Sequence, residues 1–515
     1  MDLKLNVRKI LFIGIIAGYF LFTGYIAYNQ SVSDRFNDEV AHMVGGHFVL
    51  KGKELYKDLQ FNHQPLAYYF GAAAERISSP DNLYFYISRQ RLAIYAYGLF
   101  WNILFFLFFG PYILIFSFIF EIGKYWFSGQ KLLAETLAAY PLIFMFASLI
   151  ESMFMKKHLS KIKLGLISVS TFIAGFSLLP LWIVVMPINV IIWWFQKNRK
   201  QSFLLLSIPF LFLTGILFMF ISPYNLLRET YTYNVQYFVP ETAEFRPALW
   251  QMLLFPFFTL IPPYSLTKIV SAAFVVSFFV SGYASWRTKK LIPWFLLLIL
   301  FIGTNFFRVG DSAFSSFHLL PWFGTLLIME ILLTYYFYNS KNKIVKQISK
   351  IKVILFSALF VAMILDQKHL WQKKNLTTEF EVQYSYSETY GRAIKALKDS
   401  NDTLIVAQND PLVYWVADIN TPTRMLEFYP WIYPIPEYNA EIEEIFTNNP
   451  PEFFVNTNLD LKQDLEKYIH NNLGQKYIRI DHLGKPSRLY ILKKKIPEIT
   501  DSQWKQLEDM LFSKP

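Results

Sequence analysis

The chain contains no cysteine among its 515 residues. This absence excludes disulfide bonds, a cysteine-ligated metal and a thiol nucleophile, although it says little about the compartment. Charged residues are also scarce. They make up 17% of the chain, whereas about a quarter is usual in soluble proteins. We therefore expect much of the chain to be shielded from water.

Apolar residues dominate the chain and lie in long runs. They make up 54% of the sequence, which includes 52 phenylalanines. Because an apolar helix of about 20 residues crosses a bilayer, these runs predict an α-helical polytopic membrane protein. The first run, Ile10–Tyr28, has no small-residue cleavage site after it, so we interpret it as a retained anchor rather than a signal peptide. We expect about eleven spans, at roughly 9–28, 91–109, 111–123, 132–155, 164–179, 181–196, 202–222, 266–286, 291–307, 318–338 and 353–366.

The net charge of +11 is concentrated in short loops between these runs. Such a distribution follows the positive-inside rule and argues against nucleic-acid binding. It places the N-terminus in the cytoplasm and the C-terminus outside, in a multi-pass protein of the cell membrane. The basic loops are Lys156–Lys163, Lys197–Lys200, Arg287–Lys290 and Lys341–Lys352.

The predicted domain organisation follows from these spans. A transmembrane domain covers residues 1–366 and includes a first outer loop at 29–88. A tail at 367–515 is rich in Asn, Asp, Glu and Lys, with short apolar runs between helix-like stretches. This alternation predicts a small extracytoplasmic α/β domain. The tail has no glycine-rich phosphate loop, and the chain has no internal repeat.

Titratable residues are concentrated in the first outer loop. A helix is expected to start near Asp34, which would place Asp38 four residues on along the same face, with His42 extending that stripe. Glu39 lies about 100° away round the helix, so Asp38 and Glu39 cannot both point at one atom by the same route. Such carboxylates can accept a proton from a hydroxyl group. They are also favoured at a helix start by the helix dipole, so the residues alone leave a structural role open.

The pattern also predicts how this helix begins, packs and ends. Ser31 or Ser33 is the expected cap, Gly52 is the expected end, and a second amphipathic helix is expected at Leu66–Ile77. The apolar stripe of the first helix is expected to lie on the membrane surface. It consists of Val40, Met43, Val44 and Phe48.

Several motifs in this region resemble those of a known superfamily. Their order is one N-terminal span, Asp38-Glu39, Gly52-x-x-x-Tyr56-x-Asp58, His63-Gln64-Pro65-Leu66-x-Tyr68-Tyr69 and Arg91-Leu92 at the second span. This order resembles the GT-C membrane glycosyltransferases, in particular the bacterial protein O-mannosyltransferases and lipid A aminoarabinose transferases. The resemblance is specific over residues 30–95 and looser beyond, where His318-Leu319-Leu320-Pro321 is similar to the family's entry to a late span.

The resemblance implies an activity and a set of roles. Such enzymes move a sugar, with inversion, from a polyprenyl-phosphate carrier to a protein hydroxyl, lipid or glycan at the outer membrane face. Asp38 matches the catalytic carboxylate and would act as general base. Glu39 would position the site through Arg91, which matches an arginine near the carrier phosphate. Arg308 and His318 would hold the same phosphate and offset charge on the leaving group.

The role of His63 stays open. It can be a metal ligand, a phosphate donor or a structural cap, and the sequence around it offers no evident second ligand. No cofactor is expected to be required, and a divalent metal near His63 is the one candidate.

Two other classes of function compete with a glycosyltransferase. A transporter or flippase for lipid-linked sugars would explain the carboxylates within predicted spans, Glu135 and Glu330, as a proton path. Transporters often show two similar halves, and this chain shows none. A receptor or anchor for the tail would need one span, so it leaves the other spans unexplained.

Overall fold

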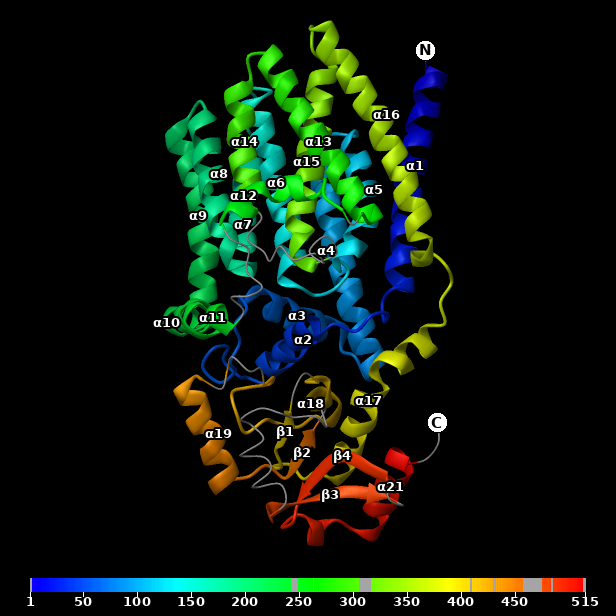
Figure 1. Cartoon of the computed structure of the whole chain (residues 1–515), viewed down its shortest axis with the longest axis vertical. Coiled ribbons are helices and arrows are strands. Elements are labelled where there is room, and N and C mark those ends of the chain that lie inside the picture. Colours follow the sequence, from blue (N-terminus) through cyan, green and yellow to red (C-terminus); the bar gives the residue numbers. More distant parts are fainter. Residues whose placement is uncertain are drawn as a thin grey trace. The chain divides into compact units, whose positions relative to one another are not determined.

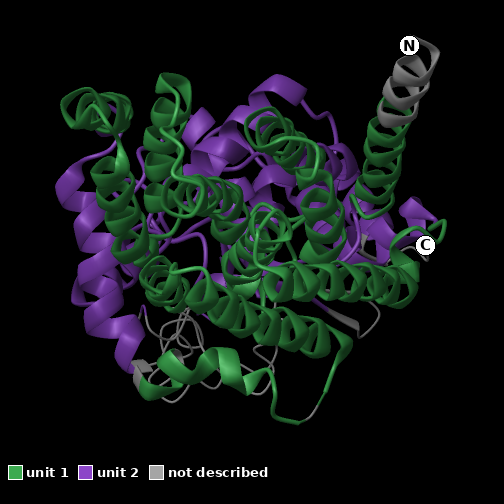
Figure 2. Ribbon diagram, turned by 90° about the horizontal axis from the view of Figure 1, so that it is seen from above, with its two compact units in different colours: residues 1–31, 91–217, 245–374 green, residues 32–90, 218–244, 375–515 purple. Residues whose placement is uncertain are grey.

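The computed structural model describes residues 2–241, 249–262, 264–304, 316–407, 410–428, 432, 434–456, 475–482 and 485–512. These residues are mostly helical (Figure 1), and they divide into two compact units, which Figure 2 shows in different colours. Unit 1 comprises residues 1–31, 91–217 and 245–374, and unit 2 comprises residues 32–90, 218–244 and 375–515. Each unit is described by itself.

Unit 1 contains the apolar helices. Each predicted span overlaps one of them, and six helices of the described residues are long and apolar enough to cross a membrane. The chain is thus a multi-pass membrane protein, and the exact number of its spans stays a prediction. The helices are α1 (Asp2–Asn29), α4 (Leu83–Phe109, which begins in unit 2), α5 (Ile113–Gly123), α6 (Ala134–Met153), α7 (Lys161–Ser177), α8 (Trp182–Phe195), α9 (Arg199–Phe218), α12 (Leu249–Phe258), α13 (Leu266–Arg287), α14 (Leu291–Gly303), α15 (Leu320–Tyr338) and α16 (Lys343–Asp366).

Helices α6 and α15 form the centre of unit 1. Every residue of α6 is buried, as are nearly all residues of α15. A helix that is apolar on all sides is stable only when it is surrounded, which explains this central place. The two helices pack closely because Gly324 has no side chain. A Cβ atom there would lie 2.5 Å from Ile143 Cδ1.

Two short breaks in unit 1 separate neighbouring helices, at boundaries between the predicted spans. α4 ends at Phe109, and Gly110 adopts a φ of +93°, which favours glycine because it has no Cβ. The second break contains a 3₁₀ turn at Leu179–Leu181, between α7 and α8. Both sites are confirmed as helix boundaries rather than kinks within one long helix.

Unit 2 combines a small sheet with amphipathic helices. β1 (Leu404–Ala407) pairs with β2 (Phe453–Asn456) in parallel. β4 (Lys485–Leu492) then pairs antiparallel with both β2 and β3 (Tyr477–His482), which gives the order β1-β2-β4-β3. The unit's longer helices are α2 (Asn37–Leu50), α3 (Leu66–Ser78), α17 (Leu376–Leu397), α19 (Pro436–Asn448) and α21 (Asp501–Phe512). Its short helices are α10 (Pro223–Leu227), α11 (Val239–Glu241) and α18 (Leu412–Ala417), with π-helical turns at Arg228–Thr232 and Asn234–Phe238 and a 3₁₀ turn at Ile496–Glu498.

The predicted membrane-surface stripe of α2 is wrong. All four of its apolar side chains are completely buried within unit 2. The reason is a close crossing of α2 and α3 at two glycines. A Cβ on Gly45 would lie 2.5 Å from the Tyr68 ring, and one on Gly46 would lie 2.6 Å from the Ala72 amide nitrogen. Burial against α3 therefore replaces the expected contact with lipid.

The predicted start of α2 is also wrong. The helix begins at Asn37, and neither serine caps it, since the cap position is Phe36 and makes no side-chain hydrogen bond. Asp34 has a φ of +56°, in the left-handed region, so it lies outside the helix and does not share a face with Asp38. The end of the helix agrees with the sequence. Gly52 has a φ of +87°, and its amide donates to the Val49 carbonyl at 3.0 Å.

Candidate functional site

The two carboxylates of the Asp-Glu motif lie in the first turn of α2. There they are near the positive end of the helix dipole, which stabilises negative charge. Glu39 is only 1% exposed, whereas Asp38 is partly exposed. Neighbouring residues of a helix point in directions about 100° apart. The Glu39 carboxylate is therefore buried, whereas the Asp38 carboxylate stays partly exposed.

His63 lies against His42, one helical turn beyond Asp38 on α2. The His42 Nε2 and His63 Nδ1 atoms are 3.1 Å apart, and the His42 ring meets the Tyr68 ring edge-on at 5.0 Å. Tyr56 donates its hydroxyl to the His63 carbonyl at 2.8 Å. Burial raises the pKa of Tyr56, so this hydroxyl keeps its proton and remains a donor. Sequence reasoning missed the histidine pair because a loop separates its members.

The loop before His63 is fixed by two segments distant in sequence. Asn234 donates its side-chain amide to the Asn62 carbonyl at 3.0 Å, and the Gln60 amide donates to the Arg424 carbonyl at 2.7 Å. All four residues belong to unit 2. The conformation around His63 is therefore set by the 218–244 segment and by the tail.

The histidine pair supplies two nitrogen donors for a cation. A zinc ion needs three or four protein ligands, and no cluster of three His, Asp or Glu side chains that could hold a metal occurs in the described ranges. The residues thus fit a metal site only in part, and the divalent metal near His63 stays a prediction. The proposed reaction does not depend on this metal.

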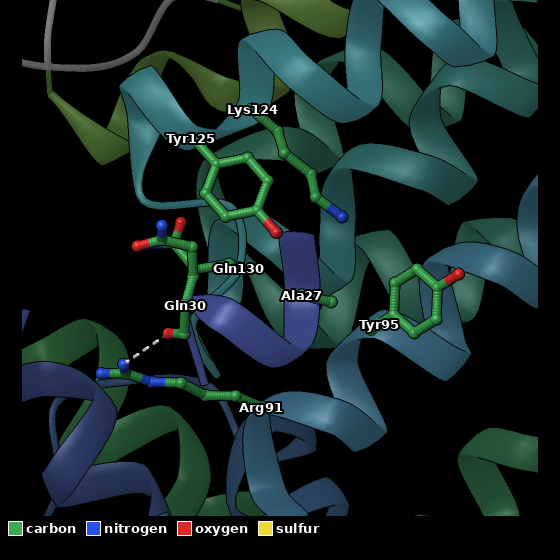
Figure 3. A pocket seen from close by; sticks show the side chains of 7 residues that line it. All are labelled: Ala27, Gln30, Arg91, Tyr95, Lys124, Tyr125 and Gln130. Atoms are coloured by element: carbon green, nitrogen blue, oxygen red, sulfur yellow. Dashed lines mark hydrogen bonds between the residues drawn. The ribbon is translucent and has the colours of Figure 1, made fainter. Parts of the chain in front are cut away.

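Unit 1 contains a small pocket, shown in Figure 3, with an accessible volume of about 10 Å³, which is close to the room that one water molecule needs. A phosphate group is larger than this volume, so it contacts the lining residues only when their side chains move apart. The pocket is formed by the end of α1, the start of the unit 1 part of α4 and the segment after α5. The lining residues are Ala27, Gln30, Arg91, Tyr95, Lys124, Tyr125 and Gln130.

Two buried cations line this cavity, Arg91 at 3% exposure and Lys124 at 2%. Lys124 forms an ion pair with Glu121, and its ammonium also lies 3.1 Å from the Tyr140 hydroxyl. Arg91 donates from Nη1 to the Gln30 carbonyl at 3.3 Å, the contact drawn in Figure 3. Arg91 and Lys124 therefore bring two cationic groups to the cavity, and the charge of Lys124 is paired with that of Glu121. Cationic groups of this kind can bind an anion such as a phosphate.

Two glutamines extend the polar lining. Gln30 Oε1 accepts from the Lys374 ammonium at 3.0 Å, which brings a third cation to the end of α1. Gln130 Oε1 is buried and has no hydrogen-bond partner. A buried acceptor without a partner is uncommon and costs free energy, so a ligand that brings a hydroxyl group there would be favoured. Of the lining residues, only Arg91 was singled out by the sequence.

His318 and Glu135 form a second polar pair in unit 1. The His318 Nδ1 and Glu135 Oε1 atoms are 2.7 Å apart, and the side chains are 25% and 6% exposed. A carboxylate at this nitrogen orients the imidazole. The other predicted phosphate ligand, Arg308, lies outside the described residues. Glu39 belongs to unit 2 and Arg91 to unit 1, so their predicted pairing is untested.

The second carboxylate within a predicted span, Glu330, is neutralised inside unit 1. It is completely buried, forms an ion pair with Lys352 at 2.6 Å and accepts from Ser281 at 3.0 Å. Ser277 also donates to it. A buried carboxylate with a cation and two hydroxyls has its charge and lone pairs satisfied. Glu330, on α15, therefore links this helix to α13 and α16.

The fold and these polar groups define a multi-pass membrane protein with a small pocket lined by two buried cations in one unit and a partly exposed carboxylate in the other. No family model matches the chain, and no curated protein matches it. Among solved structures, the chain is similar to ArnT from Cupriavidus metallidurans bound to undecaprenyl phosphate. The TM-score is 0.53 at 9% identity, over 94% of this chain and 99% of that one. The apo state of that ArnT matches with a TM-score of 0.45 at 9% identity, over 95% and 98% of the two chains.

The likeness to the ligand-bound ArnT shows a shared fold. At 9% identity it shows nothing about activity, but it extends over nearly the full length of both chains.

Proposed function

We propose that the chain is a GT-C membrane glycosyltransferase that moves a sugar from a polyprenyl-phosphate donor to an acceptor hydroxyl outside the cytosol. The observation that carries this proposal is the small cavity of unit 1, where buried Arg91 and Lys124 meet tyrosines and glutamines. The ArnT structure that shares the fold was solved with undecaprenyl phosphate, a ligand whose headgroup carries the negative charge that cationic side chains favour.

The proposed reaction is a single displacement with inversion. The acceptor oxygen bonds to the anomeric carbon of the sugar as the bond from that carbon to the phosphate oxygen breaks. Asp38 takes the proton of the acceptor hydroxyl, because it is the accessible carboxylate of the motif. The polyprenyl phosphate leaves as an anion, and Arg91 pairs with its oxygens. His318, held by Glu135, and Arg308 add positive charge to the leaving group.

Glu39 and His63 have supporting roles in this proposal. Glu39 is buried directly after Asp38 and fixes the first turn of α2. His63, paired with His42, contributes a hydrogen-bond donor beside the same helix. The acceptor is a protein hydroxyl, a lipid or a glycan of the cell envelope, and the tail in unit 2 is the part available to recognise it.

Mass spectrometry of the cell envelope tests the reaction class. Removal of the gene is expected to eliminate one glycosyl mass from a protein, lipid or glycan, and complementation should restore it. Loss of the modification together with accumulation of a polyprenyl-phosphate sugar outside the cytosol would support transfer. A donor that instead accumulates on the cytoplasmic side would support the flippase alternative.

The orientation of the chain is a separate prediction. We propose a cytoplasmic N-terminus and an extracytoplasmic tail, since the basic loops follow the positive-inside rule. An alkaline phosphatase fused after Pro515 should be active, and one fused at Lys341–Lys352 should be inactive. The reverse pattern would place Asp38 in the cytosol and exclude an extracytoplasmic reaction.

A further inference from the structure

We propose that Gln383, Ser387 and Asp410, all in the C-terminal part of the chain, are positioning residues for Asp38. They hold Arg35 and so fix the turn that leads into α2. This inference rests on the proposed function and deepens it, because it gives the tail a role in catalysis beyond contact with an acceptor.

The contacts of Arg35 reach both its side chain and its backbone. Arg35 Nη2 lies 2.7 Å from Asp410 Oδ1, and Nη1 lies 3.4 Å from Oδ2, so the guanidinium meets the carboxylate with two nitrogens. Ser387 accepts from Nη1 at 3.1 Å and donates to the same carboxylate at 2.8 Å. The Arg35 amide donates to the Gln383 side-chain oxygen at 3.2 Å.

These partners are themselves fixed. The Asp410 side chain is 5% exposed, and Ser387 is completely buried on α17. Asp410 follows β1 and lies two residues before the start of α18, where its carbonyl accepts from the Val413 amide at 3.3 Å. An ion pair that is buried and hydrogen-bonded keeps a defined geometry, unlike a pair of mobile surface side chains.

The turn that Arg35 anchors is strained. Asp34 has a φ of +56°, which a residue with a Cβ adopts only when its surroundings impose it. The next residue is Arg35, whose amide and side chain are both bound by the C-terminal part of unit 2. Asp38 follows three residues later in the first turn of α2. The three partners therefore decide where α2 begins and in which direction its first carboxylate points.

A second ion pair at the other end of α2 provides a matched control. Lys51, directly after the helix, lies 2.6 Å from Asp418, directly after α18. Both pairs join the ends of α2 to the 410–418 segment. They differ in burial, since the Asp418 side chain is 57% exposed and that of Asp410 is 5% exposed. Exposed pairs contribute little free energy, so the Lys51 pair is dispensable for positioning.

The test compares Asp410→Asn with Asp418→Asn in the full-length protein. Each variant is reconstituted in vesicles that contain the polyprenyl-phosphate sugar donor. Asp410→Asn is expected to lower kcat by about 10- to 100-fold, because a misplaced catalytic group reduces the rate without weakening ground-state binding. The KM for the donor should stay within about twofold of wild type, and Asp418→Asn should leave both constants nearly unchanged.

Two further readouts separate positioning from general destabilisation. The double variant Arg35→Gln/Asp410→Asn leaves no unpaired buried charge, so it should recover part of the lost kcat. Because the chain has no cysteine, Asn37→Cys provides a single thiol for a spin label at the start of α2. That label should become mobile with Asp410→Asn and stay immobile with Asp418→Asn.

Asp38→Asn is measured in the same assay so that two kinds of failure can be told apart. If Asp38→Asn is inactive while Asp410→Asn turns over at the wild-type rate with an immobile label, the positioning role is overturned and the proposed function stands. If Asp38→Asn itself keeps the wild-type rate, the proposed base is wrong and the positioning role falls with it. A kcat loss in Asp410→Asn that follows the unfolded fraction alone also overturns the role.

Discussion

Replacement of Arg91 with alanine is expected to raise the KM for a polyprenyl-phosphate sugar by about 10- to 100-fold. The guanidinium is 3% exposed and lines the cavity of unit 1 together with Lys124. A hydrogen bond to a charged group contributes about 1.5–3 kcal/mol. Each 1.4 kcal/mol corresponds to a tenfold change in affinity, which gives the expected range. Arg91→Lys should lie between wild type and alanine, because an ammonium lacks the planar fork that pairs with two phosphate oxygens.

Arg89 provides the matched control for this experiment. It lies two residues earlier on α4, outside the cavity, and donates to the Ser78 carbonyl at 2.6 Å. Arg89→Ala is expected to leave the donor KM within about threefold of wild type, as is usual for a substitution away from a site. Steady-state kinetics with a titrated donor provide the measurement. Equal KM values for Arg91→Ala and wild type would remove the cavity from the donor site.

Hydropathy predicted the helices of unit 1 well, because the apolar composition that a membrane helix needs depends only on the residues of that helix. A segment such as α6 or α15 must be apolar over most of its length to occupy the centre of a membrane bundle, and this requirement can be read from its own residues. The same holds for Gly52 and Gly110, whose positive φ angles depend on the backbone of one residue. These features could be placed without knowledge of any distant contact.

The start of α2 could not be predicted, because residues about 350–375 positions away determine it. Ser31 and Ser33 are good caps in isolation, but the contacts of Arg35 with Gln383 and Asp410 impose a left-handed turn at Asp34 instead. The prediction that the apolar stripe of α2 lies on the membrane surface was wrong for a related reason. Its pattern fits a membrane surface and a protein interior equally well, and only the glycines facing α3 decide between them.

The candidate site was predicted in part. Asp38 and Arg91 were found through their motifs, and the structure places the first, partly exposed, in the first turn of α2 and the second in a cavity. Lys124 was missed because a lysine at the end of an apolar segment resembles an ordinary interfacial residue. Its pairing with Glu121, three residues earlier and equally buried, is the signal that could have found it.

Asp38 is the general base of the proposed reaction and has its central chemical role. General acid–base catalysis by a positioned side chain contributes about 10²- to 10⁴-fold to a rate. Asn has nearly the same size as Asp but cannot accept the proton of the incoming hydroxyl. Asp38→Asn should therefore lower kcat by that factor while donor binding and thermal unfolding stay close to wild type. Asp34→Asn is the matched control, because Asp34 is exposed, lies outside α2 and has a left-handed conformation that Asn tolerates.

The single-turnover rate of sugar transfer by Asp38→Asn, at saturating donor and acceptor, tests this role most directly. It excludes product release and isolates the step in which the acceptor loses its proton. We predict a rate at least about 100-fold below wild type, with Asp34→Asn within about threefold. Equal rates for Asp38→Asn and Asp34→Asn would contradict the assignment of Asp38 as the base.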